Sequence, residues 1–537
     1  MKTSLFPLVL AACLQCALAA PAEHQEFEAT LLAPFQAGAA SGRTFTLTFA
    51  YPGLARPGNV DWRIELVAPD GKVALHWRGH VPLAGEEVTV PVPWSGRLGA
   101  RPALPGIYRV RMHATLRGID HHHDHDAVEQ DWEIAVGAPP APALPAFAPL
   151  PRALEPAAAP APNALPYTVY LGNLHSQSNH SDGGADVDAC TGAQPPLQAP
   201  HGPDAAFAYA HAHGLDILMV SEHNHMYDGS ARTAPDADPA AARALYRSGL
   251  DSARRFSRRH PGFLALYGVE WGVIDNGGHI NIFNSDELPG WETNAKGELM
   301  ADTLTARGDY AGLYALMRRR GWVGQFNHPA HAGQFRVDGV PLGFTEDGGK
   351  AMALCEVMNS TAFSTNTSET ETRRSRFEGA CNRLLEAGYR VAFSSNQDNH
   401  CANWGAAYSN RTGVLLPNGV ALSRATFVEA LKARRVFATM DKESQLVLTA
   451  NGRMMGESFD NRGPLALVVN YASLGGRQAA SVAIMEGVPG RNGTVTKMSD
   501  QAQTTFTPAK GAHFYYAKVT QDDGKVLWSA PVWIEQQ

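Results

Sequence analysis

Seven short apolar runs between residues 167 and 400 each carry a His, Asp or Glu at or near one end, and this pattern constrains the fold most. Helix-type stretches separate many of the runs, which is typical of α/β organisation. In a barrel of parallel strands the carboxyl ends converge on one mouth, where side chains from distant sequence positions meet. One such residue is commonly an ordinary polar cap, whereas seven in succession predict a site. The polar residues are His175, His223, Glu270, His279, His328, Glu356, Asp398 and His400, and the expected helical stretches are 203–213, 236–259, 308–320, 368–387 and 423–435.

The residue types at these strand ends are those that bind transition metals. Imidazoles and carboxylates gathered at one rim form a metal site. A metal lowers the pKa of a bound water toward 7 and so supplies a nucleophile. The G-x-S-x-G motif of serine esterases does not occur in the sequence. The pattern therefore predicts a metal-dependent hydrolase.

A segment rich in Ala and Pro, residues 138–166, marks the clearest domain boundary. Ala supplies 11 and Pro 10 of its 29 residues, and proline cannot donate a backbone hydrogen bond, so we expect an extended, semi-rigid linker. Before it, residues 20–137 show two-residue alternation between Gly/Pro turns, and residues 441–537 do so again. Period-two alternation predicts a β-sandwich on each side of a central domain, residues 167–440.

The first 19 residues read as a secretory signal peptide. Lys2 precedes an apolar stretch that ends in the small-residue site Ala17-Leu18-Ala19, so we expect a periplasmic or secreted protein. The alternative is a lipid anchor on Cys13, because Leu10-Ala11-Ala12-Cys13 resembles a lipobox. No other run is long enough to span a bilayer. With 45 Lys and Arg against 52 Asp and Glu, the net charge of −7 gives no basic surface for nucleic acid.

Several of these motifs together resemble the PHP (polymerase and histidinol phosphatase) metallohydrolase superfamily, within its secreted carbaryl-hydrolase-like branch. The resemblance covers roughly residues 167–440 and implies a distorted seven-stranded (βα)7 barrel, flanked here by the N-terminal and C-terminal β-sandwiches. The motifs that carry it are Asn173-Leu174-His175 with Ser181-Asp182-Gly183, Gly214-Leu215-Asp216 with Ser221-Glu222-His223-Asn224, Gly268-Val269-Glu270, Gly278-His279, Asn327-His328-Pro329 and Asp398-Asn399-His400.

The same resemblance implies one to three divalent ions, Zn, Mn or Fe, with two favoured, and Glu270, His328 and Asp398 as the catalytic residues. It places the ligands in three groups, with Glu270 bridging the first two. The groups are His175, Glu270 and Asp398; Glu270, His279 and His328; and Asp182, His223 and His400.

Two positions depart from the motifs of that superfamily. Gln177 stands where a second His is usual, and an amide oxygen is a poorer ligand than imidazole for these metals, so the first metal site is open to question. His180 is a candidate to compensate. Glu222 replaces an Asp, and its longer side chain could still orient His223.

Four cysteines lie outside the leader. If Glu356 points into the barrel, Cys355 points outward to the helix that carries Cys381, which suggests one disulfide. Cys190 and Cys401 both follow rim motifs and suggest a second. The alternative is four buried free thiols.

The leading function is thus an exported, metal-dependent phosphoesterase with a small-molecule ester substrate. A metal-dependent carboxylic ester, amide or carbamate hydrolase is the second hypothesis, and a catalytically decayed barrel that serves as a binding scaffold is the third. Arg411 could contact an anionic substrate or be an ordinary surface residue. The His-rich segment His121–His125 reads as a metal chelator or as an exposed hairpin loop.

Overall fold

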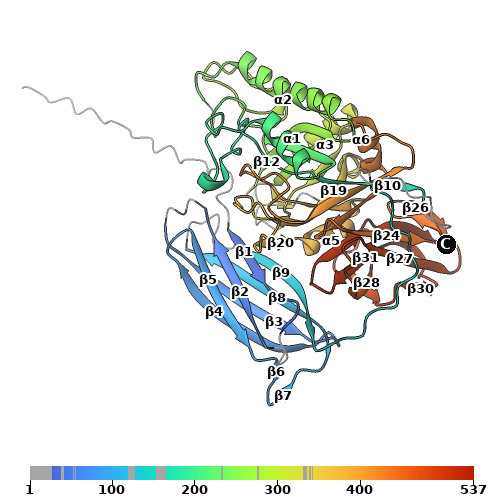
Figure 1. The fold of residues 1–537 in the computed structure, drawn as a ribbon. Coiled ribbons are helices and arrows are strands. Elements are labelled where there is room, and N and C mark those ends of the chain that lie inside the picture. Colours follow the sequence, from blue (N-terminus) through green and yellow to red (C-terminus); the bar gives the residue numbers. More distant parts are fainter. Residues whose placement is uncertain are drawn as a thin grey trace, which may run out of the picture.

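A computed structural model of the chain describes residues 27–37, 42–52, 54, 56–118, 127–152, 165–231, 234–274, 277–329, 336–337, 340–341 and 343–537. The expected leader and the segment His121–His125 lie outside these residues. An N-terminal and a C-terminal β region lie side by side, and a central region with most of the helices lies above both (Figure 1). The organisation is a mixed α/β one in which strands far outnumber helices.

The N-terminal region consists of two antiparallel sheets. One has the strand order β1-β2-β5 and the other β4-β3-β8-β9. Strand β2 shows why the sheets pack together, because its alternate residues Phe45, Leu47 and Phe49 are fully buried. The strands are β1 (Glu28–Leu32), β2 (Arg43–Ala50), β3 (Gly58–Val67), β4 (Val73–Leu83), β5 (Glu87–Trp94), β6 (Arg97–Leu98), β7 (Arg101–Pro102), β8 (Gly106–Arg117) and β9 (Ala127–Val136).

The central region is built on a curved sheet of mixed direction, which corrects the expectation of parallel strands throughout. Strands β10, β11 and β12 are parallel, but β13 is antiparallel to both β12 and β16, and β22 is antiparallel to β10. Only residues 274–277 join β12 to β13, and so short a connection reverses the chain. The strands are β10 (Tyr167–Asn173), β11 (Ile217–His223), β12 (Leu264–Val273), β13 (Gly278–Ile282), β14 (Pro289–Gly290), β15 (Thr303–Leu304), β16 (Gly324–Phe326), β17 (Arg336–Val337), β18 (Val340–Pro341), β19 (Met352–Ser360), β20 (Arg374–Arg376), β21 (Ala392–Asn396), β22 (Arg411–Pro417) and β23 (Val436–Thr439).

Asparagine side chains connect β10 and β21, two strands that share no backbone ladder among the described pairings. The amide of Leu174 donates to Asn396 Oδ1 at 2.9 Å, and the amide of Gln397 donates to Asn173 Oδ1 at 3.0 Å. These bonds satisfy buried backbone groups at the strand ends. They also bring the carboxyl ends of β10 and β21 together.

Helices cover the outer side of the central sheet. Helix α5 is half as long as the pattern at 368–387 predicts. Asn366 Oδ1 accepts hydrogen bonds from the amides of Ser368 and Thr370, and such local bonds compete with helix formation. The helices are η1 (Val187–Ala189), α1 (Pro203–Ala212), α2 (Pro239–Arg259), α3 (Tyr310–Arg320), α4 (Glu346–Ala351), α5 (Glu378–Ala387) and α6 (Arg424–Lys432). No helix among the described ranges has the length and apolar character needed to traverse a membrane.

The central sheet continues into the C-terminal region across the boundary expected at residue 440. Strand β23 pairs with β32, so the two regions share backbone hydrogen bonds. A second sheet, β25-β24-β27-β30, completes the C-terminal region. Its strands are β24 (Ser444–Ala450), β25 (Arg453–Met454), β26 (Ser458–Asn461), β27 (Leu465–Ser473), β28 (Ala479–Gly487), β29 (Thr496–Ser499), β30 (Gln503–Phe506), β31 (Gly511–Gln521), β32 (Val526–Ser529) and β33 (Val532–Gln536).

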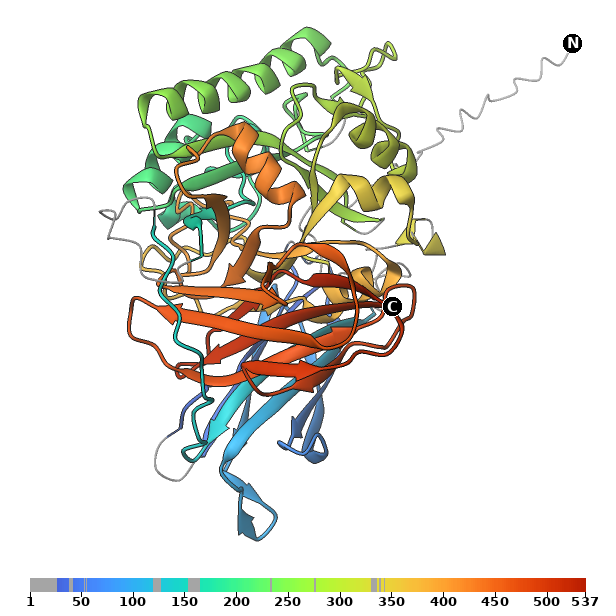
Figure 2. The ribbon, with the colours of Figure 1, turned by 90° about the vertical axis from the view of Figure 1, so that its right-hand side faces the viewer.

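The linker is extended where it is described, and it runs along the C-terminal region before it enters β10 (Figure 2). It is docked there by Gln445, whose side chain accepts from the amide of Leu150 at 2.8 Å and donates to its carbonyl at 2.9 Å. Leu150 is buried. These contacts hold the linker against the C-terminal region.

A buried ion cluster joins all three regions. Arg376 on β20 pairs with Glu378 on α5 and donates to the carbonyl of Asp131 on β9 at 2.8 Å. Lys518 on β31 lies 3.6 Å from Glu378 and 3.5 Å from Glu133. Buried charges are stable only when paired, so this cluster fixes how the regions meet.

Candidate metal centre

The central strands deliver their polar residues to one buried cluster. Most members lie at or just after strand ends, and each is at most 4% exposed. His175 follows β10, His223 ends β11, Glu270 lies in β12, His279 lies in β13, His328 follows β16, and Asp398 and His400 follow β21. Asp182 joins them from the loop after β10. The cluster therefore unites residues that are more than 200 positions apart in the sequence.

Glu270 is the centre of the cluster. Its carboxylate oxygens lie 3.0 Å from His175 Nε2, 3.0 Å from His279 Nδ1 and 3.3 Å from His328 Nε2. His223 Nδ1 is 3.8 Å away. Two groups of ligand atoms, each within 4.8 Å of one another, share this carboxylate: His175, Glu270 and His328, and His223, Glu270 and His279. Glu270 is thus placed to bridge two ions.

A third group lies beside the first two. Asp182 Oδ1 is 3.6 Å from His223 Nε2 and 3.4 Å from His400 Nε2. These three residues make up the third group that the resemblance implies. The other two groups differ from the expected ones: His328 replaces Asp398 beside His175, and His223 replaces His328 beside His279. Asp398 Oδ1 lies 3.0 Å from His175 Nε2 and 3.8 Å from His400 Nδ1. Asp398 therefore lies between the groups and belongs to none of the three triads.

The charged groups of the cluster stabilise one another. Burial opposes an imidazolium at His175, but the carboxylates of Asp398, Glu270 and Glu356 outweigh burial and raise the pKa of His175 well above its ordinary value. Burial would also raise the pKa of Glu270, yet the surrounding histidines hold that pKa well below its usual range. Carboxylates that stay ionised in a buried site need nearby positive charge.

The donor set fits divalent transition metals. It combines imidazole nitrogens with carboxylate oxygens, the ligands typical of Zn, Mn and Fe sites. The geometry offers three triads of such ligands among the described residues. The residues present therefore fit the metal that the sequence predicts.

Gln177 and Glu222, the two departures noted in the sequence, support other members of the cluster. Gln177 Nε2 donates to Glu270 Oε2 at 2.6 Å and so orients that carboxylate. Glu222 accepts from the amide of Ser178 at 3.1 Å and from Ser181 Oγ at 2.5 Å. Burial raises the pKa of Glu222 to about 7, against the opposing effect of these serines. Glu222 thus braces the loop that carries Asp182, whereas the sequence suggested contact with His223.

Two further residues hold the ligands in place. Glu356 lies 3.3 Å from His175 Nδ1 and accepts from the amide of His328 at 2.8 Å. Asn327 Nδ2 donates to Glu270 Oε1 at 2.8 Å. Such outer contacts fix the orientation of metal ligands. Asn327 belongs to the motif Asn327-His328-Pro329, and its position directly before a candidate ligand is the signal of its role in the sequence.

Two candidate ligands have left-handed backbone conformations. His328 has φ of 24° and Asp398 has φ of 49°. Residues other than glycine rarely adopt such angles, and those that do cluster at functional sites. This strain supports a functional role for both residues.

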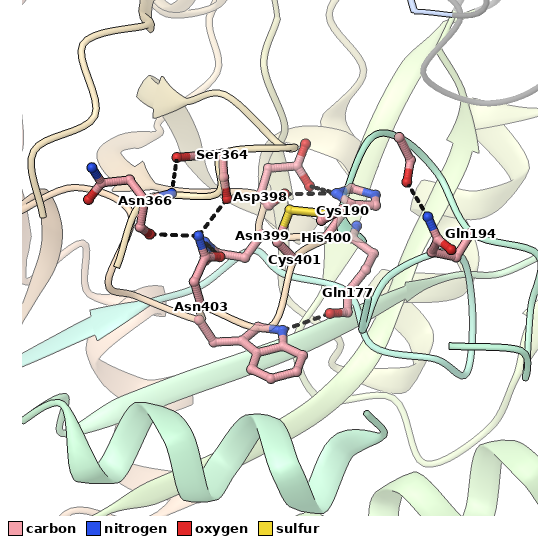
Figure 3. Close-up of a disulfide and its surroundings, with 12 residues drawn as sticks. Gln177, Cys190, Gln194, Ser364, Asn366, Asp398, Asn399, His400, Cys401 and Asn403 are labelled. Atoms are coloured by element: carbon pink, nitrogen blue, oxygen red, sulfur yellow. Dashed lines mark hydrogen bonds and ion pairs between the residues drawn. A yellow bond between two sulfur atoms is a disulfide. The ribbon is translucent and has the colours of Figure 1, made fainter. Parts of the chain in front are cut away.

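A disulfide joins the two loops that supply Asp182 and His400 (Figure 3). Cys190 pairs with Cys401, and Cys355 pairs with Cys381. Around the first bridge, the amide of Gly184 donates to the carbonyl of His400 at 2.7 Å. The bridge therefore ties the loop after β10 to the loop after β21 next to the third ligand group.

Removing this disulfide should weaken the third ligand group. In a Cys190→Ser/Cys401→Ser variant, we expect metal affinity at Asp182, His223 and His400 to fall about tenfold or more, because their loops lose a covalent tie. Metal content after dialysis against a weak chelator measures the effect. The comparison variant is Cys355→Ser/Cys381→Ser. Its disulfide joins neither loop but lies beside Glu356, so its effect should fall on His175 and His328 instead. Unchanged metal affinity in Cys190→Ser/Cys401→Ser would contradict the prediction.

Two other residues named from the sequence lie apart from the cluster. Arg411 is only 1% exposed, so it is not a surface residue, and its guanidinium pairs with Glu369 at 2.6 Å. His180 Nδ1 lies 2.8 Å from the Tyr267 hydroxyl, and burial lowers its pKa to about 4. His180 belongs to none of the ligand groups found among the described residues.

Comparison with known proteins corrects the predicted family. No family model and no curated protein matches the chain. Matching solved structures include a β-glucuronidase of Bacteroides uniformis in a covalent complex, a β-glucuronidase of Parabacteroides merdae and a glycosyl hydrolase family 2 member of Bacteroides cellulosilyticus. The first two share 10% identity at a TM-score of 0.16 and cover 95% of this chain, but 61% and 64% of their own. The third shares 10% identity at a TM-score of 0.16, with coverage of 96% and 63%.

These matches are glycoside hydrolases and not PHP metallohydrolases. The prediction of that superfamily is therefore withdrawn, together with the phosphoesterase, the carboxylic ester, amide or carbamate hydrolase and the scaffold hypotheses. The chain spans less than two thirds of the matched proteins. At this identity and TM-score the matches assign neither a glycosidase fold nor a glycosidase activity to it.

Proposed function

We propose that this chain is an enzyme whose buried cluster holds two or three divalent ions. The observation that carries the proposal is the convergence of three His and carboxylate triads, each within 4.8 Å and fully buried. A structural role explains this poorly, because burying so many ionisable groups is costly unless a cation pairs with them. Zn, Mn and Fe are the ions that suit these ligands.

Metal bound here would supply a Lewis acid and lower the pKa of water. The chain itself orients the ligands. Gln177 and Asn327 donate to opposite oxygens of Glu270, and Glu356 holds His175. Burial excludes bulk water, which strengthens each electrostatic interaction. We therefore propose that these residues orient the metal ligands. The reaction would then take place on a small molecule bound beside them.

We also propose that the protein is exported from the cytoplasm. Two disulfides in one chain are typical of oxidising compartments such as the periplasm. This supports the expected leader at residues 1–19, with processing at Cys13 as the alternative. The mass of the mature N-terminus distinguishes the two, because lipid on Cys13 excludes cleavage after Ala19.

Metal analysis tests the proposed function directly. Protein purified without chelator is expected to carry about two or three equivalents of Zn, Mn or Fe, and chelation should abolish its activity until metal is restored. The substrate screen uses nitrophenyl leaving groups, with nitrophenyl β-glucuronide as one arm. Less than about 0.2 metal per chain after reconstitution would overturn the proposal. Glucuronide hydrolysis that survives chelation would do the same.

A further inference from the structure

A pocket of about 600 Å³ lies between the end of α2, the start of β12 and the segment 421–424, where α6 begins. None of the candidate metal ligands lines it. Leu264 lines it at the start of β12, and Glu270 comes six residues later on that strand, about 20 Å along an extended chain. The pocket is therefore separate from the metal centre, and its volume suits a small molecule.

The walls of this pocket are largely apolar. Leu250 and Ala253 line it from α2, and Leu422 lines it from the segment before α6. Phe263 and Leu266 line it from the start of β12 and the residue that precedes that strand. Apart from Leu422, these side chains are at most 5% exposed. Such walls favour a ligand with an apolar body, because burying that body removes it from water.

Three arginines give the pocket a positive charge. Arg254 and Arg258 line it from α2 and Arg424 from α6, and no Asp or Glu lines it among the described residues. From outside the lining, Asp286 pairs with Arg254 Nη2 at 2.9 Å and with Arg424 Nη1 at 2.7 Å. Asp251 lies 3.3 Å from Arg254. Three guanidinium groups thus meet two carboxylates, which leaves a positive charge in excess and favours an anion.

The polar groups of the pocket that remain unused are hydrogen-bond donors. Arg424 Nη2 is buried and has no acceptor among the described residues, and Arg258 forms no ion pair with any of them. The side chain of Tyr170 also has no hydrogen-bond partner in the described ranges, and burial raises its pKa, so its hydroxyl stays protonated. The hydroxyls of Ser257 and Ser423 already accept from backbone amides. A ligand carboxylate would supply the acceptors that the unused donors lack.

We propose that this pocket binds a small amphiphilic acid, a molecule with an apolar body and one carboxylate. The apolar walls bury the body, and Arg258 and Arg424 pair with the carboxylate. The bound molecule contacts α2, β12 and α6 together and therefore stabilises the folded chain. This site is independent of the proposed function, because no candidate metal ligand belongs to its lining.

Three probes with the same phenylbutyl body test the choice of charge: 4-phenylbutyrate, 4-phenylbutanol and 4-phenylbutylamine. Binding to the full chain as purified is followed by ligand-observed NMR titration. We expect the carboxylate to bind at least about tenfold more tightly than the alcohol or the amine. Because a carboxylate can also bind a metal ion, the titration is repeated on protein treated with chelator and still folded by circular dichroism. There the affinity for phenylbutyrate should stay within about twofold.

Paired arginine variants test which cations hold the carboxylate. Arg258→Met/Arg424→Met should weaken the binding of phenylbutyrate about tenfold or more and leave that of phenylbutanol within about twofold. The matched control is Arg255→Met/Arg259→Met, which also removes two arginines. Both control positions are exposed on α2 and lie outside the lining of the pocket. We expect the control to bind phenylbutyrate as the wild type does.

A third variant tests the location independently of charge. Ala253→Phe narrows the pocket and should weaken phenylbutyrate and phenylbutanol alike, about tenfold or more. Circular dichroism checks its fold, and if it does not fold, the arginine variants decide the question. Preference for the alcohol or the amine, loss of binding on chelation, equal effects of the two arginine pairs, or unchanged binding in folded Ala253→Phe would each overturn the inference. Protein that takes up no metal but binds phenylbutyrate selectively would refute the proposed function and leave this site standing.

Discussion

A Glu270→Gln variant is expected to lose most of its metal and at least about a thousandfold in activity. The substitution preserves the shape of the side chain and removes only its charge. Glu270 belongs to two of the three ligand groups and lies within 3.3 Å of three imidazoles. An amide cannot bridge two ions as a carboxylate does, so both sites weaken together. Metal analysis and activity on the same samples measure the loss.

The matched control is Glu386→Gln. Glu386 is also a buried glutamate, but it accepts from backbone amides of residues 493–495, away from the cluster. We expect this variant to keep its metal even if its stability falls. Full metal content in Glu270→Gln would show that the cluster does not bind metal through its central carboxylate.

The second large effect concerns stability. Arg376→Met should lower the free energy of unfolding by about 3–5 kcal/mol, because it leaves the buried carboxylates of Glu378 and Glu133 without their arginine. Besides its pair with Glu378, Arg376 stacks on Trp528 at 5.3 Å. Arg373→Met is the control. Its partner is Glu87 at 3.0 Å, and with side-chain exposures of 39% and 46% this pair is worth about 0–1 kcal/mol.

The buried ion cluster around Arg376 also makes the difference in stability between the wild type and Arg376→Met depend on pH. Burial disfavours ionised Glu378, but Arg376 and Lys518 outweigh it and hold its pKa well below the ordinary 4.5. A depressed carboxylate pKa contributes stability that is present above 4.5 and is lost as the pH falls through the folded-state value. Denaturant unfolding should therefore show the wild type and Arg376→Met converging in acid. A constant difference from pH 7 to the acid limit would contradict this assignment.

The sequence indicated the residues that gather in the cluster, but it did not indicate the side-chain contacts that hold them there. His175, Glu270 and His328 could be named because each ends or follows an apolar run, and that signal is local. The contacts of Asn396 and Asn327 depend on which strands lie opposite each other, which no local pattern reveals. The family assignment rested on motif likeness alone, and comparison with known proteins did not support it.

In the fold, too, features with a local sequence signal were predicted and features that depend on long-range contacts were missed. Alternation predicted strands in both β regions, and the Ala/Pro-rich segment is extended where it is described. The reversal at β13 was missed because apolar runs carry no sign of direction. The short α5 was missed because the side-chain bonds of Asn366 override helical periodicity. Charge partners such as Arg376 and Glu133 lie too far apart in sequence to be paired by pattern.

The pairing of β23 with β32 means that the region with the candidate metal centre cannot be separated cleanly from the C-terminal region. Cutting after residue 440 would strip β23 of its neighbour and expose a row of unpaired backbone groups, which invites association between copies. It would also remove Lys518 from the ion cluster and Gln445 from the linker. A different C-terminal region could therefore replace the present one only under three conditions. It would have to supply a strand that pairs with β23, a cation in the place of Lys518 and an amide in the place of Gln445.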